Sequence, residues 1–235
     1  MARAPDFDDL RSDAESVGLA CRGGFHPDAA DDVPQFTDGD AAETVILFGF
    51  TGRGQWPSFA RSPEFADGGP DPLDRWSRRL IDALAASIGA RSLYPSDGPP
   101  WLPFQRWATK AEAVHFSPLG LLVHPDWGLW HGYRGALALR ERLRLPVLDQ
   151  RPSPCAVCAT KPCLSACPVG AVQPGRFEHP ACVGYVASSA GADCRRAGCR
   201  ARRSCPVGER HRYSAEQAGF HMRAFVRGGA VDARV

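Results

Sequence analysis

Long apolar runs and an export signal are what this sequence most clearly lacks. Within its 235 residues, no apolar run reaches the roughly 18 residues that a membrane-spanning helix needs. The opening residues, MARAPDFDDLRSDAE, are acidic where a secretion signal would carry its apolar stretch. A hydrophobic content of 44% excludes an intrinsically disordered chain. We therefore expect a folded, cytoplasmic protein that is not bound to a membrane.

Several common catalytic patterns are also missing. No Ser-His-Asp or Cys-His spacing indicates a nucleophilic enzyme, and the glycines of residues 49–54 lack the lysine of a phosphate-binding loop. Charge is unevenly distributed, because residues 1–74 hold 15 acidic and 5 basic residues while the remainder holds 11 acidic and 23 basic ones. We interpret the acidic third as a solvated surface rather than as paired catalytic carboxylates.

Cysteine is abundant, but in one region only. Eight of the nine cysteines lie between Cys155 and Cys205, and Cys21 alone lies outside. In a chain without an export signal, clustered thiols indicate metal binding rather than a disulfide framework. The clustering therefore predicts a metal centre.

The eight cysteines form two similar runs, each ending in Cys-Pro-Val-Gly. The runs are Cys155-x2-Cys158-x4-Cys163-x3-Cys167-Pro168 and Cys182-x11-Cys194-x4-Cys199-x5-Cys205-Pro206. In two-cluster ferredoxins, the cysteine before the proline binds the cluster of the other run. The pattern thus predicts two [4Fe-4S] clusters, each held by four thiolates. Set 1 is Cys155, Cys158, Cys163 and Cys205, and set 2 is Cys182, Cys194, Cys199 and Cys167.

Other interpretations of the cysteines stay open. The gaps differ from the ferredoxin spacing, so a [3Fe-4S] cluster is an alternative, as are zinc and disulfides. Residues 195, 196, 200, 202 and 203 are arginines among these cysteines. They form either a solvated surface or a charge that raises the cluster potential or docks an acidic electron donor or a nucleic acid.

The remaining sequence predicts a mixture of helices and strands. The apolar run at residues 44–50 predicts a strand buried on both faces. Helices are predicted over residues 8–18, 71–89 and 104–113, and strands over 119–124 and 129–139 around a turn at 125–128. A last helix is predicted from residue 214 to about 226, where Ser214 and Gln217 have capping-box spacing.

Two family resemblances follow from short motifs. Residues 117–138, followed by the double cysteine run, resemble epoxyqueuosine reductase and the reductive dehalogenases. Residues 124–130, with Arg134 and Gly135, are similar to the cobalamin-processing protein of the CblC type, as is the stretch 212–220. The resemblance implies an architecture, a corrinoid-type pocket beside two clusters, and we do not transfer the queuosine reaction itself.

The implied architecture is an α+β fold in three parts. Residues 1–150 would form a nitroreductase-like α/β domain, residues 151–210 a double [4Fe-4S] ferredoxin-like module, and residues 211–235 a helix packed back on the first domain. The resemblance places a corrinoid or substrate pocket at His124, Trp127, Trp130 and Arg134. The simpler interpretation of these four is hydrogen-bonded or apolar packing, with Arg134 at a helix end.

Three functions fit these observations. The first is an oxidoreductase in which two clusters deliver electrons to cobalamin or to another substrate in the first domain. The second is a ferredoxin-like electron carrier without catalysis, and the third is a protein that carries cobalamin and reduces it. A ferredoxin- or flavodoxin-type donor is an expected partner, and the basic residues are also compatible with nucleic acid.

Overall fold

The computed structural model describes residues 6–232, with side chains described up to residue 228. Contacts divide the described chain into two units. The first unit extends to Ala113 and resumes at His131–Gln150, and the second comprises Val114–Trp130 and the chain from Arg151 onward. Residues 1–5 and 233–235, the ends of the predicted first and last parts, lie outside the described residues.

The first unit contains ten helices and strands among its described residues. They are α1 (Phe7–Ser16), β1 (Ala20–Phe25), the 3-10 helix η1 (Ala29–Asp31), β2 (Thr44–Thr51), α2 (Trp56–Ala60), α3 (Pro63–Ala66), α4 (Pro72–Ile88), β3 (Arg91–Leu93), α5 (Phe104–Ala111) and β6 (His131–Leu139).

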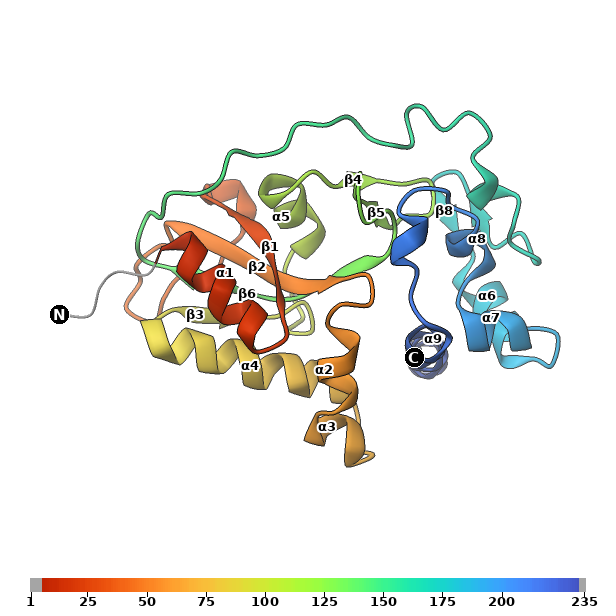
Figure 1. Cartoon of the computed structure of the whole chain (residues 1–235), viewed down its shortest axis with the longest axis horizontal. Helices are drawn as coiled ribbons and strands as arrows, with labels where there is room; N and C mark the ends of the chain where they lie inside the picture. The colour runs from red at the N-terminus through yellow and green to blue at the C-terminus, as the bar shows by residue number, and fades with distance from the viewer. Residues whose placement is uncertain (1–5, 233–235) are drawn as a thin grey trace. The chain divides into compact units, whose positions relative to one another are not determined.

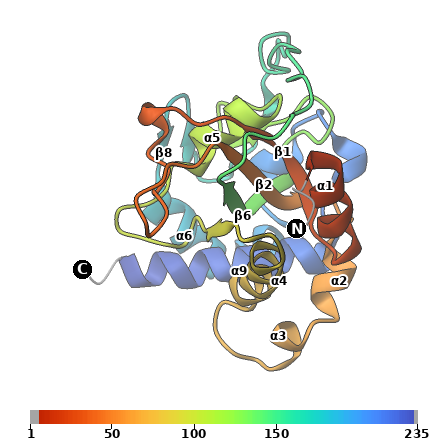
Figure 2. The same cartoon turned by 90° about the vertical axis from the view of Figure 1, so that its left-hand side faces the viewer.

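An antiparallel sheet in the order β1-β2-β6-β3 organises this unit. All seven residues from Thr44 to Phe50 are buried in β2, which confirms the predicted strand with two covered faces. Figures 1 and 2 show the sheet between α4 and α5. Trp107 of α5 is fully buried, and its indole nitrogen donates to the carbonyl of Asp31 at 2.8 Å. The sheet therefore lies inside a helix-covered core.

Local sequence signals account well for the helices of the first unit. α4 begins with Pro72 at its first turn and ends at Gly89, which adopts a φ of 69°. A residue with positive φ is the usual helix terminator, and glycine takes this conformation without strain. Helix α1 is capped by the carboxylate of Asp6, which accepts from the amide of Asp9 at 2.8 Å. The helices predicted over residues 8–18, 71–89 and 104–113 are thus confirmed, with ends that differ by at most two residues.

The strands expected around residues 125–128 differ from the prediction. The turn is present, because His124 and Gly128 exchange two backbone hydrogen bonds of 2.9 Å. The strand before it is shortened to two residues and pairs with β4 (His115–Phe116), whereas β6 pairs with β2 and β3. The two flanking segments therefore belong to different sheets and not to one hairpin.

The second unit is made of short elements and one long helix. They are β4 (His115–Phe116), β5 (Leu122–Val123), η2 (Pro162–Leu164), β7 (Val172–Gln173), β8 (Arg176–Phe177), α6 (His179–Ala187), α7 (Ala192–Ala197), α8 (Arg200–Arg203), η3 (Glu209–His211) and α9 (Ala215–Asp232). Together with the first unit, they make the α+β class that the sequence predicts.

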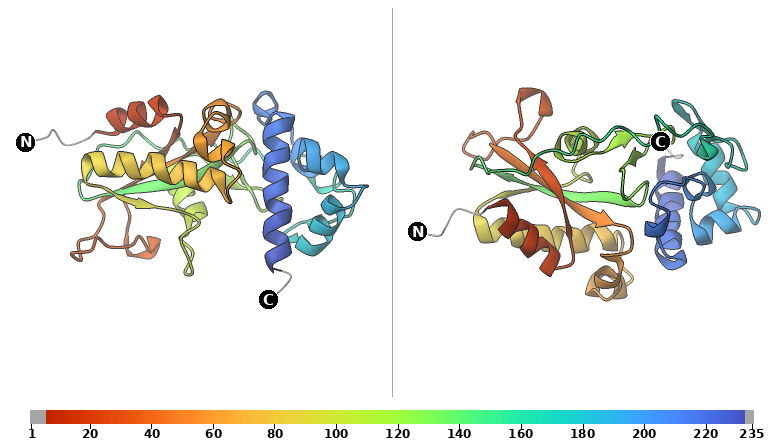
Figure 3. Two further views of the ribbon diagram at one scale, coloured as in Figure 1. Left: turned by 90° about the horizontal axis from the view of Figure 1, so that it is seen from below. Right: turned by 45° about the horizontal axis from the view of Figure 1, so that its top comes forward.

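The long helix α9 begins where the capping pattern predicts. The hydroxyl of Ser214 accepts from the amide of Gln217 at 3.1 Å. The helix packs against α6 and α7 (Figure 3). A Cβ added to Gly198 would lie 3.3 Å from Ala218, so small side chains allow this close packing. Contacts assign this helix to the second unit with α6 and α7, and its predicted packing on the first domain stays a prediction.

The segment 114–130 precedes the cysteine region in sequence but is assigned to the second unit, where Val123 and Leu129 are buried against Cys205. The chain from residue 151 onward completes this unit. The three-part domain division stays a prediction. No helix of residues 6–232 is both long and apolar enough to span a membrane.

Candidate metal centres

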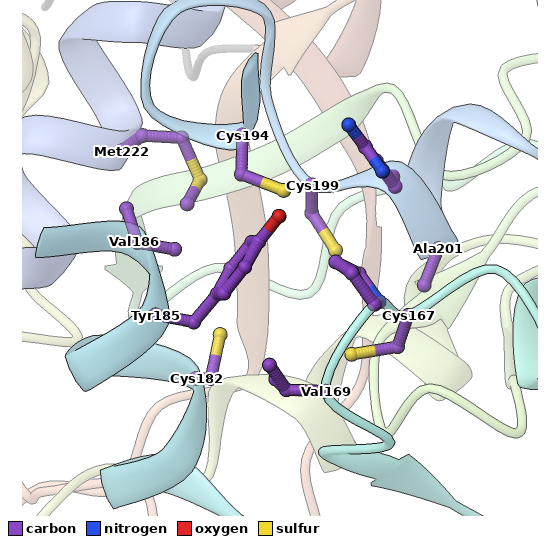
Figure 4. A pocket seen from close by; sticks show the side chains of 11 residues that line it. Cys167, Val169, Cys182, Tyr185, Val186, Cys194, Cys199, Ala201 and Met222 are labelled. Atoms are coloured by element: carbon purple, nitrogen blue, oxygen red, sulfur yellow. The ribbon is translucent and has the colours of Figure 1, made fainter. Parts of the chain in front are cut away.

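The four cysteines of set 2 line one pocket of the second unit. Figure 4 shows their sulfur atoms directed toward this pocket. Three come from the second run, through α6, α7 and the residue that precedes α8, and Cys167 comes from the first run, after η2. Apolar side chains complete the wall: Val169, Val186, Ala201 and Met222. The fold thus brings a cysteine of the first run together with three of the second.

Electrostatics reflect the closeness of these thiols. Burial, with smaller contributions from the thiolates of Cys199, Cys167 and Cys194, raises the pKa of Cys182 to about 11. Burial likewise raises the pKa of Cys199, with smaller effects from Cys194 and Cys167. Thiolates are the form of cysteine that binds metal. A positive charge at the centre of this pocket would therefore stabilise the deprotonated thiols.

Set 1 is assembled in the same crossed manner. Burial raises the pKa of Cys155, and the thiolates of Cys205, Cys163 and Cys158 act in the same direction. The pKa of Cys163 is raised by burial and then by Cys205 and Cys158. Cys205 of the second run therefore lies among three cysteines of the first.

Two short helices connect the sets. Cys163 lies in η2 and belongs to set 1, and Cys167 follows it in set 2. Cys199 of set 2 precedes α8, and Cys205 of set 1 follows it. The helices η2 and α8 contact each other. This one contact therefore helps to position cysteines of both sets.

All nine cysteines lie within the described residues, and none of them forms a disulfide. Cys21 lies on β1 of the first unit, where burial raises the pKa of its thiol to about 11. Among residues 6–232, no three His, Cys, Asp or Glu side chains are arranged to hold a single metal ion. The thiols of set 2 line a pocket, and those of set 1 lie near one another without a single-ion geometry among the described residues.

The arginines among the cysteines mostly make internal contacts. Arg200 and Arg203 both pair with Asp193, and their guanidinium groups lower the pKa of that carboxyl. Arg195 donates to the carbonyls of Val186 and Ser188, and Arg202 donates to that of Leu129. Arg196 is exposed. Arg200 is exposed as well, so the internal contacts argue against a plain solvated surface only for Arg195, Arg202 and Arg203.

The predicted pocket residue His124 organises its own turn. It is buried, and its Nδ1 accepts from the amides of Asp126 at 3.0 Å and Trp127 at 3.3 Å. Trp127 packs on His211, with ring centroids 4.4 Å apart. These contacts match the packing interpretation that the sequence left open.

Trp130 and Arg134 fall in different units. Trp130 is buried beside Tyr213, with centroids 5.4 Å apart, and Arg202 lies over both rings. Arg134 lies on β6 of the first unit and pairs with Asp74. The four predicted pocket residues are therefore not brought together within one unit, and their role toward a corrinoid stays a prediction.

Sequence reasoning missed a buried polar cluster in the first unit. Arg22 is 2% exposed and pairs with Glu112, while Tyr133 donates a hydrogen bond to the same carboxylate. Arg22 also donates to the carbonyl of Phe50 at 2.7 Å and to Nδ1 of His131 at 3.2 Å. Because arginine can only donate, Nδ1 of His131 is the acceptor in this contact. These residues are far apart in sequence, and no local motif marks them.

Comparisons with known proteins give solved structures but no family match. The sequence matches no protein-family profile and no curated protein. The chain is similar to epoxyqueuosine reductase in complex with a tRNA-Tyr epoxyqueuosine-modified stem loop, at 17% identity over 91% of this chain and 62% of that one, with a TM-score of 0.47.

Two further solved structures give similar values. The enzyme from Bacillus subtilis is 16% identical over 92% of this chain and 63% of its own, with a TM-score of 0.47. The enzyme from Streptococcus thermophilus is 14% identical over 85% and 65%, with a TM-score of 0.48. This chain spans less than two thirds of the length of each.

Proposed function

We propose that this chain is an iron–sulfur redox protein that holds two [4Fe-4S] clusters, one in each cysteine set. The observation that carries the proposal is the crossed arrangement. Cys167 of the first run lines the pocket of Cys182, Cys194 and Cys199. The exchange of the last ligand between runs is the arrangement of two-cluster ferredoxins.

The residues present fit such clusters. Each set supplies four thiols, which is the number that a [4Fe-4S] cluster uses. The four thiolates of a cube bind four different irons, whereas a zinc ion draws its thiolates to about 2.3 Å from one point. Thiols spread around a pocket, as in set 2, are compatible with the cluster. The apolar wall of that pocket limits access of water, which is one of the factors that set a cluster's potential.

When bound, such clusters supply one-electron transfer. The protein would hold the thiolates through η2, α6, α7 and α8, and it would supply positive charge through Arg200, which lines the set 2 pocket. Positive charge nearby favours the reduced and more negative cluster. The paired Asp193 reduces that effect.

The electron acceptor decides between an enzyme and a carrier. In the oxidoreductase proposal, a corrinoid or another substrate binds the first unit and receives the electrons. The internal contacts of His124, Trp127 and Arg134 favour the second candidate, an electron carrier, because these side chains already have protein partners.

Titration with cob(II)alamin separates the two candidates. The protein would be purified without oxygen, its clusters reconstituted, and its visible and EPR spectra followed during the titration. A stoichiometric change of the cobalamin signal supports the oxidoreductase or the cobalamin-reducing protein, and turnover with a substrate then distinguishes these. Unchanged cobalamin spectra, with intact clusters, would contradict a corrinoid site and favour the carrier.

A further inference from the structure

We propose that the turn at residues 125–128 is a positioning element for Cys205, the crossed ligand of set 1. Both belong to the second unit, although the turn precedes the cysteine region in sequence. The inference rests on the proposed function, since it concerns how one of the two clusters is held.

Two glycines allow the backbone of this turn to pack closely against the Cys-Pro-Val-Gly turn that begins at Cys205. A Cβ on Gly128 would lie 1.9 Å from the carbonyl oxygen of Val207, and a Cβ on Gly208 would lie 2.5 Å from the amide nitrogen of Gly128. Both glycines have positive φ, 58° and 68°. Since real Cβ atoms do not approach this closely, any larger residue at either position forces the two backbones apart.

Apolar packing extends the contact to the ligand itself. Val123 and Leu129, on either side of the turn, are buried with Cys205, and Leu119, Cys155 and Val207 pack against them. His124 stabilises the turn by accepting two of its amides. The segment 119–129 therefore forms a wall of set 1.

Arg202 of α8, the helix between Cys199 and Cys205, bonds to the segment 119–129. Its Nε donates to the carbonyl of Leu129 at 3.1 Å. Its guanidinium lies 4.8 Å from the ring centroid of Trp130 and 4.6 Å from that of Tyr213. Because the guanidinium is planar and donates in fixed directions, lysine would not reproduce this contact.

The equivalent glycine of set 2 is packed differently. Gly170 ends the first Cys-Pro-Val-Gly and has a φ of 60°, but a Cβ added there would have no atom of the described residues within 4 Å beyond its chain neighbours. Gly170 and Gly208 therefore both adopt a positive φ, but only Gly208 is packed closely against another backbone segment. This makes Gly170 a matched control for Gly208.

The test compares Gly208→Ala and Gly170→Ala after identical anaerobic reconstitution. Two [4Fe-4S] clusters correspond to about eight irons per chain. We expect Gly208→Ala to bind about half the wild-type iron and to keep one of two EPR signals, while Gly170→Ala keeps both. Full iron in Gly208→Ala, or equal losses in both variants, would overturn the inference. A wild-type protein that binds no iron and sulfide would instead refute the proposed function.

A second pair of variants covers the case in which Gly208→Ala does not fold. Arg202→Met removes the donor to Leu129, and Arg196→Met, at an exposed arginine of α7, serves as its control. The account predicts that the set 1 signal is lost more than twofold faster under air in Arg202→Met than in Arg196→Met. Equal rates for that signal would contradict a positioning role for the segment.

Discussion

Arg22 and Glu112 form an ion pair inside the first unit, with Nη2 of Arg22 2.6 Å from Oε1 of Glu112 and Nε 3.3 Å from Oε2. The arginine side chain is 1% exposed and the carboxylate 15%. Burial raises the pKa of Glu112, and the charge of Arg22 opposes that rise. The pair therefore holds two charges in the core of the first unit.

Replacing Arg22 by Met should destabilise the protein strongly. The substitution leaves Glu112 buried without its cation, which costs about 3–5 kcal/mol in comparable buried pairs. Urea denaturation followed by circular dichroism measures the loss. Arg142→Met is the control, because Arg142 and Glu43 form an exposed pair worth about 0–1 kcal/mol. Similar midpoints for the two variants would show that the buried pair is not structural.

Acid should weaken a second ion pair, between Glu64 and Arg79. The hydrogen bond from Arg79 lowers the pKa of Glu64 from 4.5 to about 2. A lowered folded-state pKa contributes stability that is present above pH 4.5 and is lost as the pH falls toward 2. Glu64→Gln should therefore lose about 1 kcal/mol at pH 7 and little at pH 2. Asp13→Asn, at an exposed position of α1, is the control, and an unfolding profile of Glu64→Gln that parallels wild type at every pH would refute the assignment.

Serine substitutions test the crossed ligands. Cys167→Ser should remove the cluster of set 2 although Cys167 belongs to the first run, and Cys205→Ser should remove that of set 1. Each variant is expected to keep about half of the wild-type iron and a different one of the two EPR signals. Cys21→Ser should retain both clusters, since Cys21 lies on β1. Unchanged iron and spectra in both ligand variants would show that the crossing is wrong.

Neutralising Asp193 should raise the potential of the set 2 cluster. Arg200 and Arg203 both pair with this carboxylate, so Asp193→Asn leaves their charges uncompensated beside the pocket. A positive charge favours the reduced cluster, and we expect a rise on the order of tens of millivolts. A redox titration followed by EPR measures it. Asp126→Asn, which removes the carboxylate paired with Arg151 elsewhere in the unit, is the comparison, and a fall in the set 2 potential of Asp193→Asn would contradict the sign.

Local signals explain what the sequence could predict. Pro72 and Gly89 mark the ends of α4 because they act on their own backbone, and Ser214 does the same at the start of α9. The grouping of the thiols was also predictable in part, since the Cys-Pro ends recur at a spacing that suggests crossing. The ligand roles remain a prediction for the experiments above.

Long-range packing explains what the sequence could not predict. The interlocked turns depend on Gly128 meeting Gly208, two positions that share no local pattern. Arg22 and Glu112 are 90 positions apart, and each alone reads as an ordinary surface charge. The turn at residues 125–128 was correctly predicted, but its neighbours pair with strands of different sheets, which only the folded chain decides.

The most direct test of the account is the iron and acid-labile sulfide content of the anaerobically purified, reconstituted protein, measured with its EPR spectrum after reduction. Two [4Fe-4S] clusters predict about eight irons and eight sulfides per chain, with two cluster signals in the reduced state. A protein that takes up zinc or iron but contains no acid-labile sulfide would contradict the central claim.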